Sequence, residues 1–208
     1  MSKRRSTTAV DPPNADKIGE GTHGIVYESV DKDHNPVAIK RFKSQREGVS
    51  ATAYREMALL RNIEHENIVK LLDIHISPKG DGPAALRLSL AFEHIAGGDL
   101  AQKLRSLRST QQHLAPCAVR SLMRQLCNGL AHLHQCKVMH RDIKPANLLL
   151  DTSRGEDQPW RLVICDFGLS RLNDAPLRPL GLDGPVVTAW YRAPELLLGA
   201  PTHGPPID

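Results

Sequence analysis

The sequence predicts an α+β protein in which a strand-rich first half is followed by a helix-rich second half. Short apolar segments separated by glycine- and proline-containing turns, a pattern typical of strands, fill residues 17–95. After residue 95, apolar side chains recur at the spacing of amphipathic helices. The 208 residues suffice for two small lobes, each with a core. We therefore expect a bilobal chain with a flexible tail over 1–16, a first lobe over 17–95 and a second lobe over 96–208.

Composition narrows the class of protein. Charged residues make up 24% and hydrophobic residues 40%, as in soluble globular proteins. The net charge of +4 is too small to argue for nucleic-acid binding. The sequence contains neither an apolar run of transmembrane length nor a signal-peptide pattern, which predicts a protein that is neither membrane-spanning nor secreted. Because the four cysteines form no CxxC pair, we expect reduced thiols that act as small core residues at Cys117, Cys127, Cys136 and Cys165.

The first lobe is expected to consist of strands and one helix. Residues 18–27 place glycines between apolar flanks, which predicts two strands joined by a tight loop, and residues 36–40 predict a third strand. An amphipathic helix is predicted over 50–62, and further strands are predicted over 68–76 and 85–92.

A glycine pattern in the first lobe, Gly19-x-Gly21-x-x-Gly24, is a weak signal by itself. Such glycines let backbone N–H groups approach phosphates, but they also occur in plain hairpins and in dinucleotide-binding folds. The dinucleotide fingerprint expects a helix next, whereas here another strand follows, and then a strand that ends in Lys40. A lysine at a strand end is usually a solvated charge, but Glu56 on the predicted helix is a candidate ion-pair partner. This context favours a lid over the phosphates of a nucleotide.

The second lobe is predicted to be mainly helical. Asp99 should cap a helix that carries Leu100, Leu104 and Leu107. The predicted helix over 116–135 places six apolar residues on one face. These are Val119, Leu122, Met123, Leu126, Leu130 and Leu133. Residues 151–159 are polar and rich in turn formers, which predicts a surface insertion.

Two motifs in the second lobe carry the chemistry: His-Arg-Asp-Ile-Lys-Pro-Ala-Asn over 140–147 and Asp-Phe-Gly over 166–168. Asp142 can accept a hydrogen bond from a substrate hydroxyl, and Lys144 offers a cation to a phosphoryl group in transfer. Asn147 and Asp166 supply oxygen ligands of the kind that magnesium prefers. Asp-Phe-Gly alone is common by chance, but here it follows a predicted strand and precedes Ala-Pro-Glu at 193–195.

In this order, the motifs resemble those of the eukaryotic protein kinase superfamily over residues 17–208. The resemblance implies a bilobal protein-kinase-like fold and a serine/threonine kinase that uses ATP and Mg²⁺. It implies catalytic roles for Asp142, Lys144 and Asn147. It implies metal ligation by Asn147 and Asp166. The implied ATP-binding residues are Ile18, Gly19, Gly21, Gly24, Val26, Ala38, Lys40, Glu56, Phe92, Glu93, Asp99 and Leu149.

Further segments resemble the cyclin-dependent kinases within that superfamily. Residues 50–56, Ser-Ala-Thr-Ala-Tyr-Arg-Glu, look like the PSTAIRE helix that docks a cyclin, and residues 186–195 look like the substrate-binding segment. The latter implies protein substrates with Ser/Thr-Pro. In that segment no acceptor remains for the N–H of the residue after the phosphoacceptor, and proline lacks this N–H. The insertion over 151–159 and the Pro-Leu-Arg-Pro-Leu segment over 176–180 are similar to those of Mediator-associated kinases. That similarity implies a cyclin C-like partner and a nuclear location, without direct contact to nucleic acid or membrane.

The resemblance also implies regulation through the activation segment. Asp183 falls about where relatives carry an activating phosphothreonine, so it would offer one negative charge to Arg55, Arg141 and Arg171. The alternative is that Asp183 is a solvated loop residue. His23 stands where many relatives have a phosphorylatable tyrosine. The implied regulatory residues are Arg55, Arg141, Arg171, Asp183, Thr188, Arg192 and Glu195.

The end of the sequence leaves alternatives to an active kinase. Ile207-Asp208 matches the start of the family's central helix, so we expect a second lobe that lacks its later helices. One alternative is a catalytically impaired chain that binds cyclin or nucleotide. The other is a truncated gene model.

Overall fold

The computed structural model describes the chain in seven stretches. These are residues 16–21, 24–42, 51–78, 86–153, 159–173, 189–200 and 203–208. The chain divides into two compact units, Met1–Glu64 with Val69–Ile95 and His65–Ile68 with Ala96–Asp208. The change from strands to helices that the sequence indicates near residue 95 coincides with this division. Within the described stretches, no helix combines the length and the apolarity needed to cross a bilayer.

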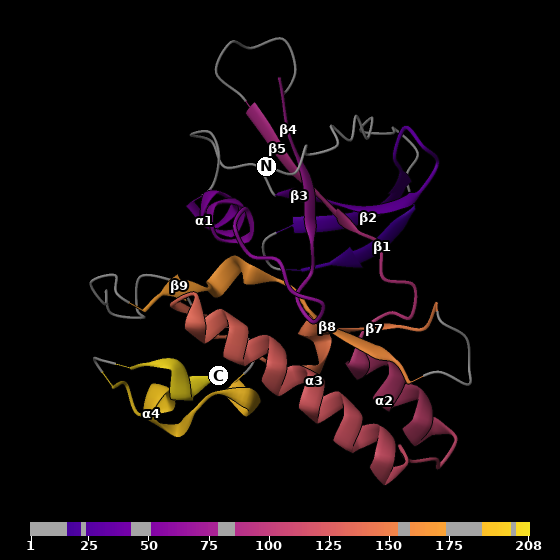
Figure 1. Ribbon diagram of the computed structural model, residues 1–208, viewed down its shortest axis with the longest axis vertical. Helices are drawn as coiled ribbons and strands as arrows, with labels where there is room; N and C mark the ends of the chain where they lie inside the picture. The colour runs from indigo at the N-terminus through magenta and orange to yellow at the C-terminus, as the bar shows by residue number, and fades with distance from the viewer. Residues whose placement is uncertain are drawn as a thin grey trace. The chain divides into compact units, whose positions relative to one another are not determined.

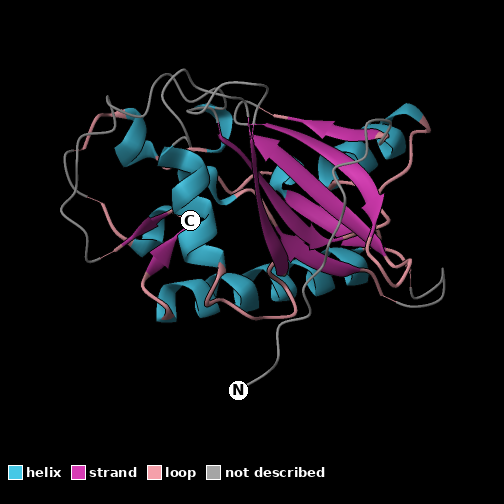
Figure 2. Cartoon of the chain, turned by 90° about the horizontal axis from the view of Figure 1, so that it is seen from above, coloured by secondary structure: helices cyan, strands magenta, loops and turns pink. Residues whose placement is uncertain are grey.

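The first unit is built on an antiparallel sheet of five strands in the order β1-β2-β3-β5-β4 (Figure 1; Figure 2). Its elements are β1 (Lys17–Glu20), β2 (Gly24–Val30), β3 (Pro36–Phe42), α1 (Ala51–Leu60), β4 (Leu71–Pro78) and β5 (Leu86–Glu93). Val37 and Ile39 are buried on one face of β3 and pack with Leu72. Lys40 does not end its strand as the sequence predicted, because β3 continues pairing with β2 as far as Phe42.

The second unit combines helices with two small two-stranded sheets (Figure 1). Its two long helices and its strands are α2 (Leu100–Ser109), α3 (Pro116–Gln135), β6 (Val138–Met139), β7 (Leu148–Asp151), β8 (Arg161–Ile164) and β9 (Arg171–Leu172). Its short helical turns are η1 (Pro145–Asn147), η2 (Phe167–Leu169), η4 (Ala189–Tyr191), α4 (Pro194–Leu197) and η5 (Pro205–Ile207). β6 pairs with β9, and β7 pairs with β8. The predicted cap of α2 is present, since the Asp99 carboxylate accepts the Gln102 N–H at 2.8 Å.

Helix α3 has the predicted limits but a narrower buried stripe than predicted. Leu122, Gly129 and Leu133 are buried, whereas Val119 and Met123 are exposed to 43% and 52%. The buried residues recur seven and four positions apart, so they follow the line along which α3 packs on β8. Side chains off that line remain at the surface.

The prediction that the cysteines are core residues was wrong. Cys117, Cys127 and Cys136 are exposed, and Cys165 is partly buried. All four thiols are free. Cys127 follows Leu122 by five residues, which turns it about 140° away from the buried stripe of α3.

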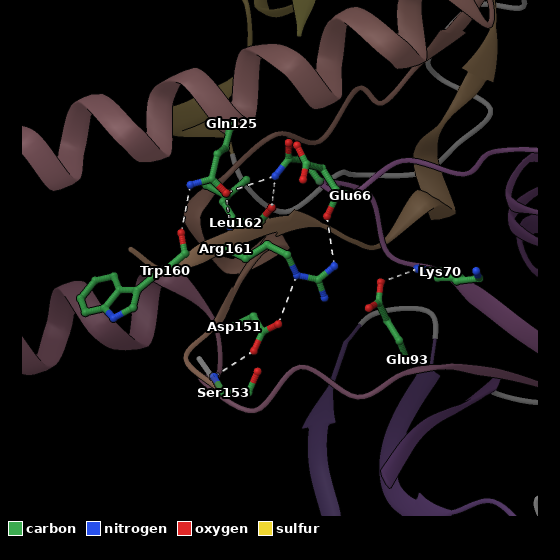
Figure 3. Close-up of polar contacts among 10 residues, drawn as sticks. Glu66, Lys70, Glu93, Gln125, Asp151, Ser153, Trp160, Arg161 and Leu162 are labelled. Carbon is green, nitrogen blue, oxygen red and sulfur yellow. Dashed lines mark hydrogen bonds and ion pairs between the residues drawn. The ribbon is translucent and has the colours of Figure 1, made fainter. Parts of the chain in front are cut away.

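A polar network joins α3 to β8 and to residues 65–68 (Figure 3). Gln125 Oε1 accepts the backbone N–H of Leu162 at 2.8 Å and the Asn67 amide at 3.2 Å, while its Nε2 donates to the Trp160 carbonyl at 2.9 Å. Gly129 permits this close approach, because a Cβ there would lie 2.8 Å from Ile164 Cδ1. The network therefore fixes β8, the strand that leads into Asp166.

The sequence placed Asp151 in a polar insertion, but Asp151 ends β7. Its carboxylate accepts the Ser153 N–H at 3.0 Å and a hydrogen bond from Arg161 Nε at 3.1 Å (Figure 3). Burial raises the pKa of Asp151, but the Ser153 hydrogen bonds and the Arg161 charge outweigh it and leave this pKa lowered. Residues 154–158 of the predicted insertion lie outside the described residues.

Candidate active site

A buried ion pair in the first unit links β3 to α1. Lys40 Nζ donates to both carboxylate oxygens of Glu56, at 2.9 and 2.7 Å. Lys40 is 8% exposed and Glu56 is 1% exposed. The ion pair that the sequence predicted is therefore present, and it holds the ammonium group at a fixed point beside the sheet.

Four of the predicted nucleotide-binding residues share one face of the sheet. Val26 lies opposite Lys40 across β2 and β3, and Ala38 lies opposite Phe92 across β3 and β5. Residues that lie opposite each other in an antiparallel pair project from the same face, as do positions two apart on a strand. Val26, Lys40, Ala38 and Phe92 thus form a continuous strip that includes the Lys40 cation.

The glycines at the β1–β2 turn have different local roles. At Gly24 a Cβ would lie 2.4 Å from the Arg41 carbonyl oxygen, so the pairing of β2 with β3 itself requires glycine. At Gly21 a Cβ would meet nothing within 4 Å, and the Gly21 N–H donates to the Gly24 carbonyl at 2.9 Å. Packing in this structure therefore explains Gly24 but not Gly21. Ile18, beside this turn, is 42% exposed.

Two other predicted nucleotide-binding residues use their side chains locally. The Glu93 carboxylate accepts the backbone N–H of Lys70 at 3.0 Å, which ties the end of β5 to the start of β4 (Figure 3). Asp99 caps α2 and forms an isolated bridge with Leu149 of β7. Any nucleotide contact made by Glu93 or Asp99 would come in addition to these structural roles.

The catalytic-loop motif of the second unit converges on the Asp142 carboxylate. Lys144 Nζ donates to Asp142 Oδ2 at 2.7 Å, and Asn147 Nδ2 donates to the same oxygen at 2.9 Å. Asn147 Nδ2 also donates to the Asp142 backbone carbonyl at 2.8 Å. The structure thus brings together the three residues that the sequence predicted to be catalytic.

His140 forms the buried floor of this loop. Its Nε2 donates to the Cys165 carbonyl at 3.0 Å, and its Nδ1 accepts the Asp142 N–H at 3.3 Å. The two contacts require a neutral imidazole, and burial correspondingly lowers the pKa of His140. The ring also meets Phe167 edge-on, with the ring centroids 4.9 Å apart. His140 therefore joins the catalytic loop to the Asp-Phe-Gly turn.

Asp208 anchors the catalytic loop from the far end of the sequence. Its buried carboxylate accepts the N–H groups of His140 and Arg141 at 2.8 and 2.6 Å, and it pairs with His134 Nε2 at 2.9 Å. Sequence reasoning assigned no role to this side chain. The only signal was the match of Ile207-Asp208 to the start of a family helix.

Asn147 and Asp166 fit the predicted magnesium site in their chemistry. Both amide hydrogens of Asn147 point toward Asp142, which directs its Oδ1 elsewhere. Asp166 follows β8 in a left-handed conformation, with φ of 63°. No cluster of three or more histidine, cysteine or acidic residues suited to a metal occurs in the described stretches. Magnesium takes one or two protein carboxylates and completes its shell with water and substrate phosphate, so Asn147 and Asp166 would suffice as its protein ligands.

Five of the seven predicted regulatory residues lie in the described stretches of the chain. Arg55 lies on α1 of the first unit, whereas Arg141 and Arg171 lie in the second unit, where Arg171 pairs with Met139 across β9 and β6. Arg192 and Glu195 are partly buried next to and within α4. Asp183 and Thr188 lie outside the described residues. Their proposed roles in activation remain predictions.

Comparison with known proteins places this site in a family. Residues 14–208 match the protein kinase domain. Cyclin-dependent kinase E-1 of Arabidopsis thaliana is 46% identical over 92% of this chain and 40% of its own length. Probable cyclin-dependent kinase 8 of Dictyostelium discoideum is 43% identical over 92% of this chain and 50% of its own length.

A third relative, cell division control protein 2 homolog D of Antirrhinum majus, is 40% identical over 93% of this chain and 60% of its own length. The chain thus spans between 40% and 60% of these three relatives. The kinase resemblance and the bilobal fold that the sequence predicted are confirmed by the matched domain and these relatives. The chain belongs to the protein kinase domain family, with cyclin-dependent kinases among its relatives.

Proposed function

We propose that this chain is the catalytic part of an ATP-dependent serine/threonine kinase of the cyclin-dependent type, acting on Ser/Thr-Pro sites of proteins. The observation that carries the proposal is the fixed Asp142 carboxylate. Lys144 and Asn147 both bond to Oδ2, and no donor from the described residues bonds to Oδ1. One oxygen is thereby held in place while the other can accept a hydrogen bond from a substrate hydroxyl.

The remaining residues have roles that follow from their positions. Magnesium-ATP, when bound, supplies the phosphoryl group. Lys40, held by Glu56, would bind its α- and β-phosphates, while Asn147 and Asp166 would hold the metal. Asp142 orients the hydroxyl and takes up its proton, and Lys144 places a positive charge near the transferred group.

A cyclin-type partner is proposed for the outer face of α1. Ala53, Glu56 and Leu60 face inward and are buried, whereas Tyr54 is 64% exposed. An exposed aromatic side chain on a helix whose inner face is packed suits a protein interface, because it brings a large contact area together with a polar tip. We extend this proposal to a cyclin C-like partner and a nuclear location on the sequence resemblance alone.

A second candidate is a catalytically impaired chain that binds cyclin or nucleotide. The first unit favours this candidate, because it contains by itself the Lys40–Glu56 pair, the strip of predicted nucleotide-binding residues and α1. Such a chain would bind magnesium-ATP and its partner without phosphate transfer.

One experiment distinguishes the two candidates. The chain with a cyclin C-like partner is assayed for transfer of labelled phosphate to a Ser-Pro peptide and to its Ser-Ala counterpart, alongside Asp142→Asn. The kinase proposal expects transfer that prefers Ser-Pro and is abolished by the substitution, while magnesium-ATP still raises the melting temperature of both proteins. A melting shift without transfer would support the binding module instead.

A further inference from the structure

His203 belongs to none of the sequence motifs described above, and the proposed reaction gives it no role. Both its ring nitrogens, Nδ1 and Nε2, are buried, and neither has a hydrogen-bond partner among the described residues. A neutral imidazole carries one donor and one acceptor, so this arrangement leaves two polar groups unsatisfied. Buried polar groups are usually paired, and a histidine left in this state points to a ligand.

The segment that carries His203 is docked on the catalytic loop. Five residues further on, the Asp208 carboxylate accepts the N–H groups of His140 and Arg141, and η5 packs against β6. β6 in turn pairs with β9, which contains Arg171. These contacts bring the segments that carry His203, Arg141 and Arg171 close together within the second unit.

Four charged groups act on the His203 imidazole, three from these elements and one, Glu195, from α4. Burial and the positive charges of Arg141 and Arg171 oppose its protonation, whereas Asp208 and Glu195 favour it. The net effect lowers the pKa of His203, so the ring is neutral at neutral pH. An additional negative charge beside the two arginines would reverse this balance and draw a proton onto the ring.

We propose that His203 is a proton-linked ligand of an oxyanion held by Arg141 and Arg171. The imidazole donates one hydrogen bond to the anion, and binding takes up one proton from solvent at His203. The fitting chemical class is a tetrahedral dianion, either a phosphate monoester or a free ion. The proposal rests on the proposed kinase function and on the family resemblance, which implies that these arginines gather a negative charge of the activation segment. It adds that the binding of this charge depends on pH.

The test uses sulfate, because its charge stays constant between pH 5.5 and 8.5 whereas phosphate itself titrates. The imidazole signal of His203 is followed by NMR across this range, in sulfate and in chloride of equal ionic strength. We expect sulfate to raise the titration midpoint by about half a pH unit or more, equivalent to about threefold tighter binding to the protonated form. An unchanged midpoint, or sulfate affinity that is equal at pH 6 and pH 8, would overturn the proposal.

Variants separate the roles of the residues. His203→Gln keeps a hydrogen-bond donor but cannot titrate, so its sulfate affinity should lose the pH dependence. Arg171→Gln should weaken sulfate binding at every pH. His113→Gln, which changes an exposed histidine, should behave like the unaltered protein. O-phospho-L-threonine that binds more tightly than sulfate would identify a phosphorylated side chain as the source, whereas equal binding would identify a free ion.

The sulfate experiment and the phosphate-transfer assay can fail independently of each other. Phosphate transfer to the Ser-Pro peptide without any response of His203 to sulfate would refute this inference and leave the kinase proposal standing. A response to sulfate without phosphate transfer would do the reverse.

Discussion

The buried Lys40–Glu56 pair allows stability and function to be separated in one set of variants. Replacing only Lys40 by Met removes the lysine partner of a carboxylate that is 1% exposed, which should cost about 3–5 kcal/mol of unfolding free energy. Replacing Glu56 by Leu as well removes the buried charge. Because an apolar pair of similar volume avoids the desolvation of two ions, the double variant should be as stable as the unaltered protein, or up to about 1–4 kcal/mol more stable.

Nucleotide binding should not follow stability in these variants. Urea unfolding gives the stability of each variant, and the melting temperature with and without magnesium-ATP gives nucleotide binding. The double variant should fold well but lose the nucleotide-dependent rise, since the ammonium for the phosphates is absent. The matched control exchanges the exposed pair Lys70–Glu64, 2.6 Å apart, for Met and Leu, which should leave both the stability and the nucleotide-dependent rise nearly unchanged. A double variant as unstable as Lys40→Met, or one that keeps its nucleotide response, would refute the reasoning.

Four further predictions concern the second unit. Asp208→Asn replaces one acceptor oxygen by an amide nitrogen, so amide hydrogen exchange at His140 and Arg141 should quicken by an amount equivalent to about 1–3 kcal/mol, while Asp33→Asn on the surface leaves it unchanged. Gln125→Leu strands the Leu162 N–H and should lower the unfolding free energy by about 1–3 kcal/mol, against no loss for the exposed Gln112→Leu. Burial lowers the pKa of His65 and His140, so the unfolded chain binds more protons than the folded one below the ordinary histidine pKa of about 6.5. The unfolding free energy should therefore be full above that pH and fall as the pH drops further. An unfolding free energy that does not change between about pH 7 and pH 5 would contradict this. Asp166→Asn should weaken the magnesium dependence of nucleotide binding, and equal dependence would remove Asp166 from the metal site.

Elements with strong local signals were predictable from the sequence. Helix α3 has the predicted limits, because proline suits the first turn of a helix and an apolar repeat continues for five turns. The Asp99 cap is equally local, with acceptor and donor three residues apart. β4 and β5 begin one to three residues later than predicted, since apolar runs do not mark where pairing starts.

Features that depend on distant residues were not predictable. Gln125 looks like any polar residue on a helix, and only the approach of β8 gives it its partners. The same holds for Asp208, which reaches His140 across 68 positions of sequence. The chemical residues themselves were found because their order is fixed within short motifs. The side chains that hold those motifs in place come from elsewhere in the chain and have no pattern of their own.

The catalytic loop shows why such distant anchors are needed. Arg141 and Asp166, which flank the reactive residues, have φ of 70° and 63°, in a region that costs a residue other than glycine about 1–3 kcal/mol. Local sequence does not favour these conformations, so contacts must hold them. Arg141 donates its N–H to Asp208, and His140 bonds to the carbonyl of Cys165, directly before Asp166. Each strained residue is thus next to, or part of, a bond that spans distant segments, and the geometry around Asp142 depends on those bonds as much as on the motif that supplies its residues.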